Sequence, residues 1–167
     1  SDENGENFVT VKEIAEYMQE HKQELFDENP MMITQERHEV SQVIADAPRF
    51  QSLKFFGVVS EWDKDTTKQF AAVTVEVEPS VRLVVFRGTD ETLIGWKEDF
   101  LMTYSPLVAA QTDAKEYLAK QASLWDGDLM ISGHSKGGNL AIYAAATQAE
   151  DVQLRIVDIF CFDSPGL

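Results

Sequence analysis

Apolar residues recur along the chain with two different periods, which divide it into an N-terminal helical part and a later part rich in strands. Four apolar residues near the start follow one another at helical spacing: Val11, Ile14, Met18 and Leu25. Thr10 and Glu13 form the pattern of a capping box, in which each side chain satisfies an amide at the start of a helix. We therefore expect helices at residues 11–26 and 35–47, the second ended by Pro48.

After about residue 50 the period shortens, and valines at positions 73, 75 and 77 alternate with other residues as in a strand. In chain order we expect strands at 55–62, 70–78 and 81–87, helices at 91–104 and 112–124, a strand at 129–132, a helix at 139–149 and a strand at 154–162. Pro79 marks a turn, so the second and third strands should form an antiparallel hairpin. Each later strand–helix–strand unit implies a right-handed crossover with parallel pairing. The fold class is α/β.

Charge and composition exclude several kinds of partner. The 167 residues include 14 Lys+Arg against 29 Asp+Glu, a net charge of −15, whereas nucleic acids and anionic membranes both require clustered positive charge. Cys161 is the single cysteine, so no internal disulfide can form. The chain contains no apolar run of about 18 residues that would span a membrane, and its N-terminus does not resemble a secretory signal. We expect one cytoplasmic domain over residues 1–167, with a helical part at 1–50 and a sheet part at 51–167.

The most informative stretch is Gly133-His134-Ser135-Lys136-Gly137, which fits the pattern G-x-S-x-G. An apolar strand precedes it and a helix rich in small residues follows it, as the turn called a nucleophile elbow requires. A serine at such a turn is forced into strained backbone geometry that exposes its hydroxyl, while the glycines allow the helix to cross close to the strands. A phosphate-binding loop does not fit, because Gly138 is followed by Asn139-Leu140 instead of Lys-Ser/Thr.

A second segment supports this interpretation. The strand at 81–87 ends in Gly88-Thr89, and an acyl-transfer site needs a hydrogen-bond donor from a second strand end, opposite the amide that follows the serine. Thr89 is placed to supply that donor. Taken alone, Gly-Thr at a strand end would only mark the start of a helix.

These segments resemble a known group of enzymes. Three motifs carry the resemblance: Phe86-Arg87-Gly88-Thr89 with Trp96 and Asp99, then Gly-His-Ser-Lys-Gly-Gly-Asn, then Phe162-Asp163-Ser164-Pro165-Gly166. In this order they are similar to the class-three (fungal-type) lipases and, more closely, to an uncharacterised bacterial family of lipase-like α/β hydrolases. The resemblance runs from about residue 70 to the end. It implies an α/β-hydrolase-like mixed sheet flanked by helices.

The resemblance also implies roles for individual residues. Ser135 would be the nucleophile, and Thr89 with the backbone amide of Lys136 would form the oxyanion hole. The segment 91–100 would occupy the position of the lipase lid, with His134 and Trp96 near the substrate. An ordinary amphipathic surface helix explains segment 91–100 equally well.

The general base is where the pattern departs from the family. In α/β hydrolases the chain order is serine, acid, histidine, but His21, His38 and His134 all lie at or before the elbow. His134 adjoins Ser135 in a tight turn, where the two side chains cannot readily form the base–nucleophile hydrogen bond. His21 is expected at the edge of the core, and His38 in solvent.

The acid is equally open. Asp163 follows the last strand at its carboxyl end, where functional residues of such sheets gather, and it is the candidate acid. Asp151 and Asp158 precede or lie within that strand. In the class-three pattern the acid comes one strand later, beyond Leu167. We therefore expect the chain to be truncated at its C-terminus.

Three functions remain. The first is a serine hydrolase acting on a small ester or lipid-like substrate through an acyl-enzyme at Ser135, and the second is a catalytically incomplete, hydrolase-like binding module. An acyltransferase using the same serine is the third. No metal or organic cofactor is indicated, since the chain has neither a Cys/His cluster nor a dinucleotide-binding pattern. Cys161 alternates with phenylalanines in the last strand and is expected to be a buried apolar filler.

Overall fold

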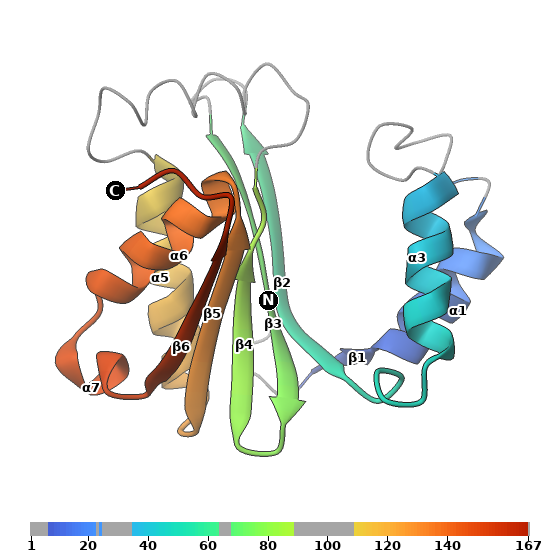
Figure 1. The fold of residues 1–167 in the computed structure, drawn as a ribbon, viewed down its shortest axis with the longest axis horizontal. Helices are drawn as coiled ribbons and strands as arrows, with labels where there is room; N and C mark the ends of the chain where they lie inside the picture. The colour runs from blue at the N-terminus through green and yellow to red at the C-terminus, as the bar shows by residue number, and fades with distance from the viewer. Residues whose placement is uncertain (1–6, 23, 25–34, 64–67, 89–108, 167) are drawn as a thin grey trace.

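The computed structural model describes residues 7–22, 24, 35–63, 68–88 and 109–166 (Figure 1). Its elements in chain order are β1 (Val9–Thr10), α1 (Val11–Glu20), α3 (Gln35–Asp46), β2 (Lys54–Asp63), β3 (Lys68–Glu78), β4 (Val81–Phe86), α5 (Ala109–Ser123), β5 (Asp128–His134), α6 (Lys136–Ala146), α7 (Glu150–Gln153) and β6 (Ile156–Phe162). The predicted helix at 91–104 lies outside the described residues.

The strands form one mixed sheet of six strands, in the order β1-β2-β3-β4-β5-β6. Strands β1, β2, β3 and β4 are paired antiparallel in sequence, and the β3–β4 hairpin turns at the predicted position. Strands β4, β5 and β6 are parallel, with Val84 opposite Ile131 and Ile131 opposite Ile159. A mixed sheet with an antiparallel part, a parallel part and flanking helices confirms the predicted α/β class.

Helices α5 and α6 cover one face of this sheet and bury the main core (Figure 1). Val84, Ile131, Leu118 and Leu140 are fully buried in that core. The alanines of α5 and α6 allow the two helices to approach each other and the strands closely, because a methyl side chain adds little bulk. This layer fixes the position of α6, and therefore of the turn that precedes it.

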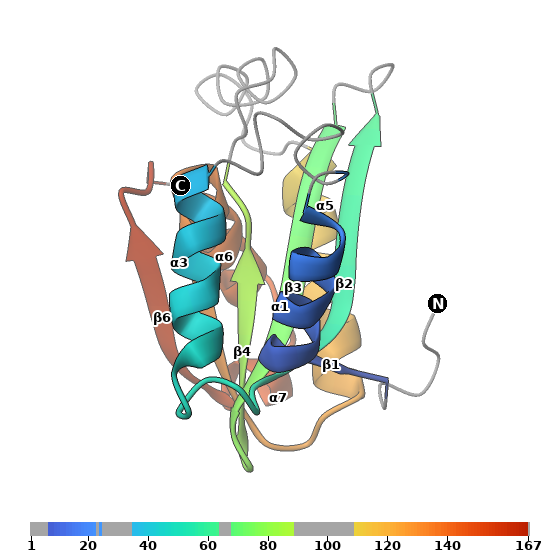
Figure 2. The same ribbon diagram turned by 90° about the vertical axis from the view of Figure 1, so that its right-hand side faces the viewer.

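Helices α1 and α3 lie side by side on the other side of the sheet (Figures 1 and 2). The capping box is present at the start of α1: the Thr10 amide donates to Glu13 Oε2 at 2.8 Å, and the Glu13 amide donates to Thr10 Oγ1 at 3.2 Å. The Thr10 hydroxyl also donates to Glu13 Oε2, at 2.7 Å, and the two bonds that this carboxylate accepts from Thr10 hold the pKa of the Glu13 carboxyl below its usual range. Helix α1 ends at Glu20, and residues 23, 25 and 26 of the predicted helix lie outside the described residues.

The prediction for His38 was wrong. Its side chain is 4% exposed, whereas the polar pattern of the helix had placed it in solvent. Ala45, seven residues later on the same face of α3, is also buried and lines the contact with α1. The face that carries His38 is therefore the covered one, and apolar residues such as Val40 and Val43 are exposed instead. His21 is half-buried at the end of α1, where its ring stacks on Tyr17 at 4.1 Å.

Two details differ at the C-terminal end. The helix predicted at 139–149 begins earlier, at Lys136, and ends at Ala146, and the short helix α7 follows it. Cys161 is exposed, so the prediction of a buried filler was wrong. Strand β6 is the last strand of the described sheet, and all of its residues after Ile156 are exposed, including Val157, Phe160 and Phe162.

Candidate active site

The candidate residues gather where the parallel strands end. Because β4, β5 and β6 are parallel neighbours, their carboxyl ends meet at one edge of the sheet. Gly88 follows β4 after one residue, Ser135 follows β5 directly, and Asp163 follows β6 directly. The structure therefore brings the predicted elbow and the predicted acid to the same edge.

Ser135 occupies a strained turn between β5 and α6. Its φ of 54° and ψ of −127° lie in a region that residues with a side chain rarely adopt, which carries a strain of about 1–3 kcal/mol. Although Ser135 is the N-cap of α6, its side chain makes no capping hydrogen bond to the helix. The residue is half-buried. Its hydroxyl is thus not committed to the usual task of a serine at this position.

Close contacts of two glycines make this turn possible. A Cβ atom added at Gly137 would collide with the main-chain oxygen of Phe86, and one added at Gly133 would collide with the main chain of Gly137. Helix α6 therefore crosses directly over the ends of β4 and β5, as the sequence pattern predicts. In both contacts the neighbouring atoms belong to the main chain, so no flexible side chain could move aside to make room for a Cβ atom.

The first residue of α6 is Lys136, which has two separate features. Its amide stands at the positive end of the helix dipole, next to Ser135, where negative charge on a substrate oxygen would be stabilised. Its side chain is only 1% exposed and therefore lies within the protein rather than in solvent. Sequence reasoning addressed the amide and did not anticipate this burial.

The end of β4 touches the elbow. A Cβ atom at Gly88 would lie 2.5 Å from the His134 main-chain oxygen and 3.5 Å from Ser135 Cβ. Thr89, the next residue, lies outside the described residues, as do Trp96, Asp99 and the segment 91–100 compared with a lid. Within the described residues, therefore, Gly88, the residue before Thr89, is what contacts the elbow.

Of the three histidines, His134 adjoins the elbow, and the other two lie on helices across the sheet. His134 is exposed at the end of β5, directly before Ser135. His21 caps α1 and His38 lies on α3, and these helices are on the side of the sheet opposite α6 (Figure 1). The structure does not bring His21 or His38 to the edge that carries Ser135.

Asp163 is held beside the elbow through its main chain. The Ser135 amide donates to the Phe162 carbonyl oxygen at 2.9 Å, so the residue before Asp163 is bonded to the serine itself. Asp163 has a φ of 47°, which turns the chain sharply after β6. Its side chain is exposed.

Two buried side-chain amides next to the elbow were not predicted from the sequence. Gln111 on α5 and Asn139 on α6 are 4% and 3% exposed and are hydrogen-bonded to each other. The available signal for Asn139 was a polar residue directly after Gly137-Gly138, at the start of a helix rich in small apolar residues.

An apolar hollow of about 360 Å³ opens along β2, β3 and β4. Its lining residues are Val58, Val59, Ser60, Ala71, Ala72, Val73, Val85 and Arg87. Arg87 directly precedes Gly88, so one end of the hollow lies close to the elbow. Its lining suits an apolar group better than a charged one.

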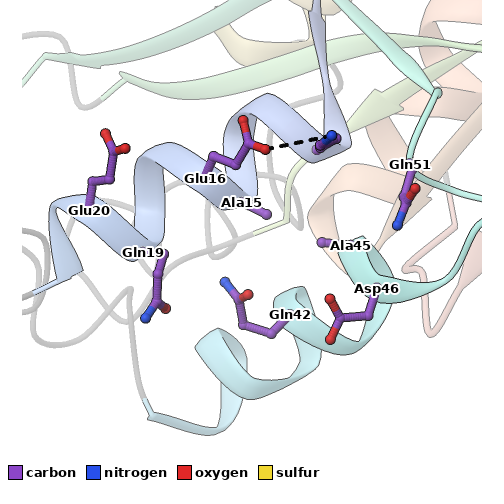
Figure 3. Close-up of a pocket in the computed structure, with 9 residues that line it drawn as sticks. Ala15, Glu16, Gln19, Glu20, Gln42, Ala45, Asp46 and Gln51 are labelled. Atoms are coloured by element: carbon purple, nitrogen blue, oxygen red, sulfur yellow. Dashed lines mark ion pairs between the residues drawn. The ribbon is translucent and has the colours of Figure 1, made fainter.

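A second hollow, of about 350 Å³, lies between α1 and α3 (Figure 3). It is lined by polar side chains such as Gln19, Gln42 and Asp46, and by the ion pair of Lys12 with Glu16 at 3.8 Å. It contains no residue of the elbow and does not suit an acyl chain.

Within the described ranges, no group of three or more His, Cys, Asp or Glu side chains is arranged to hold a metal ion. None of the helices in those ranges is both long and apolar enough to cross a membrane.

Comparisons with known proteins agree with this geometry. A family model described as Mbeg1-like matches residues 44–167. A solved structure of a fungal lipase in complex with an inhibitor, presented as a model for interfacial activation in lipases, is similar over 95% of this chain, with 18% identity and a TM-score of 0.54. The chain spans 64% of the length of that lipase, and the match at this identity shows a shared fold. No curated protein matches the chain.

Proposed function

Because the chain belongs to the Mbeg1-like family and has a lipase-like fold, we propose that it is a serine hydrolase acting on ester or acyl substrates through Ser135. One observation carries the proposal: Ser135 has φ 54° and ψ −127° at a strand-to-helix turn, with a hydroxyl that does not cap the helix. A serine in this strained geometry whose hydroxyl does not cap the following helix is typical of a nucleophile.

The proposed reaction has two steps. Ser135 Oγ attacks the carbonyl carbon of the ester, its proton passes through a general base to the departing alcohol, and the acyl group remains bonded to Oγ. Water then attacks the acyl-enzyme, which releases the carboxylic acid and regenerates the serine. The Lys136 amide and Thr89 stabilise the negative oxygen in both steps, while Asp163 orients the base.

The substrate we propose is apolar on its acyl side. The hollow along β2, β3 and β4 has apolar walls and ends at Arg87, next to the glycine that contacts the elbow. His134 and Trp96 complete the substrate-binding residues of this proposal. The cytoplasmic location expected from the single cysteine stays a prediction.

Ester hydrolysis tests this proposal. p-Nitrophenyl esters of increasing acyl length should be hydrolysed by the wild-type protein, with kcat/KM rising from acetate to medium-length acyl chains. Ser135→Ala should abolish the activity, because the proposed reaction forms the acyl-enzyme on Ser135 Oγ. Activity that survives in Ser135→Ala would refute the role of the serine.

A binding module without catalysis is the second candidate, and the position of the histidines favours it. His21 and His38 lie on α1 and α3, across the sheet from Ser135, and His134 adjoins the serine in the same turn. Under this alternative the protein would bind a nonhydrolysable ester analogue with equal affinity before and after Ser135→Ala, and it would turn over none of the esters.

A further inference from the structure

A chain of buried amides joins α5, α6 and the segment that follows β6. Gln111 Nε2 donates to Asn139 Oδ1 at 2.9 Å, and Asn139 Nδ2 donates to the Gly166 carbonyl oxygen at 2.8 Å. Gln111 and Asn139 are 4% and 3% exposed. A carboxamide can accept and donate at once, so Asn139 is able to link two partners that neither a carboxylate nor an apolar side chain could link.

The main chain of Asn139 is bonded to the candidate nucleophile. Ser135 O accepts from the Gly138 amide at 2.9 Å and from the Asn139 amide at 3.4 Å, closing the first turn of α6. One end of Asn139 therefore touches the elbow, and its side chain touches the segment after β6. Asn139 therefore connects the turn that carries Ser135 to the segment that carries Asp163, and the distance between these two segments sets the distance between the serine and its candidate acid.

Further contacts hold the same two segments together. The Ser135 amide donates to Phe162 O at 2.9 Å, and Cys161 Sγ donates to Gly138 O at 3.5 Å. A Cβ atom at Gly138 would lie 2.6 Å from Ser164 Cβ, so the helix start and the turn after Asp163 are in direct contact. Asp163 lies in the middle of this segment, with a φ of 47°.

We propose that Asn139, supported by Gln111, is a positioning residue that sets the placement of the Asp163 turn relative to Ser135. The proposal rests on the proposed hydrolase function. Asn139 acts through the segment it holds and does not touch the substrate. A buried polar pair with satisfied partners fixes one arrangement, because any other arrangement leaves a buried donor or acceptor unpaired.

The test compares Asn139→Ala and Asn139→Asp with a matched control. Gln148 lies two residues after the end of α6, away from the elbow, and its Nε2 donates to Lys115 O on α5 at 2.9 Å and to Ala144 O on α6 at 3.1 Å. Gln148→Ala therefore removes a side-chain amide hydrogen bond to α5, at a more exposed position, without touching the segment that carries Asp163. All variants are made in the full-length protein, and the melting temperature of each is measured to check that it is folded.

Three readouts are measured: kcat and KM for a p-nitrophenyl ester, the rate of reaction of Ser135 with an active-site phosphonate, and hydrogen exchange of residues 162–166. In both Asn139 variants we expect kcat and the phosphonate rate to fall at least tenfold, KM to change less than twofold, and exchange of 162–166 to rise. Gln148→Ala should leave all three unchanged, even where it lowers the melting temperature. If Asn139→Ala does not fold, Asn139→Asp and Gln111→Glu provide the same comparison, because both keep the size of the side chain and replace the donating NH2 group with an oxygen that only accepts.

The outcomes separate this inference from the proposed function. Asn139 variants that react like the wild type, or unchanged exchange of residues 162–166, overturn the positioning role while the hydrolase proposal stands. A wild-type protein whose Ser135 does not react with the phosphonate overturns the hydrolase proposal itself. An equal loss of kcat in Gln148→Ala also overturns the inference, since it would show that general weakening of the α5–α6 contact is enough.

Discussion

Ser135 keeps its strained conformation because the atoms around it leave no alternative. Its amide is bonded to Phe162 O, its carbonyl accepts from the first turn of α6, and the glycines on either side place backbone directly against backbone. Strain of this kind persists only where the surroundings hold it in place. At the scale of single residues, the candidate site therefore depends as much on its glycines as on the serine.

Gly137→Ala tests this dependence. The new methyl group would collide with the Phe86 carbonyl oxygen, and neither main chain can move without displacing α6 or β4. We expect a loss of about 3 kcal/mol in the free energy of unfolding, measured with urea, at the upper end for overpacked sites. Gly166→Ala is the control: a Cβ there meets nothing within 4 Å, and its effect should stay within about 0.5 kcal/mol. Equal stability of both variants would contradict the close crossing of α6.

At the scale of elements, α5 and α6 anchor the sheet through few polar contacts in an apolar layer. One of these joins β3 to α5, where the hydroxyls of Thr74 and Tyr117 lie 2.9 Å apart. Thr74 is fully buried and Tyr117 is 5% exposed. Burial raises the pKa of Tyr117 to about 12, and the hydrogen bond to Thr74 offsets part of that effect.

The raised pKa predicts a loss of stability in alkali. The folded-state pKa of about 12 lies above the ordinary value of 10.0, so the unfolded chain loses the phenolic proton first. The contribution of the Tyr117 phenol to the free energy of unfolding is therefore complete below the ordinary pKa. It declines as the pH rises toward the folded-state pKa, by no more than about 1.4 kcal/mol per pH unit. Urea unfolding across this range should show a decline that is smaller in Tyr117→Phe. A parallel decline in both proteins would contradict the assigned pKa.

Sequence patterns located most elements because each element satisfies a local rule. The hairpin at Pro79 and the crossovers around α5 and α6 follow from period and turn chemistry, and both are present. The burial of His38 and the exposure of Cys161 did not follow, because each depends on which elements pack against α3 and β6. The contact of Asn139 with Gln111 joins residues 28 positions apart, so no local pattern contains it.

At the scale of the whole molecule, the acidic chain has one face with a well-packed core and an end strand that is poorly covered in the described structure. Along β6, Val157 is 52% exposed and Phe162 58%, and Leu154 just before the strand is 80% exposed. An exposed apolar strand at the end of a sheet offers both its hydrogen-bonding groups and its side chains to another chain.

Self-association through β6 follows for a polypeptide of residues 1–167. We expect its apparent mass, measured by sedimentation, to increase with concentration, and Val157→Lys to shift the population toward the monomer. Lysine places a charge on the strand and disfavours strand pairing. Val43→Lys on α3 is the control, because Val43 is 71% exposed but lies outside the sheet. A similar reduction by both substitutions would indicate a general effect of charge instead.

The central claim is that Ser135 is a nucleophile, and intact-mass spectrometry after treatment with an active-site phosphonate tests it most directly. We predict one adduct per chain on the wild-type protein and on Ser123→Ala, which removes an exposed serine of α5. Ser135→Ala should gain no adduct. A wild-type protein that remains unmodified, or an equal adduct on Ser135→Ala, would contradict the account.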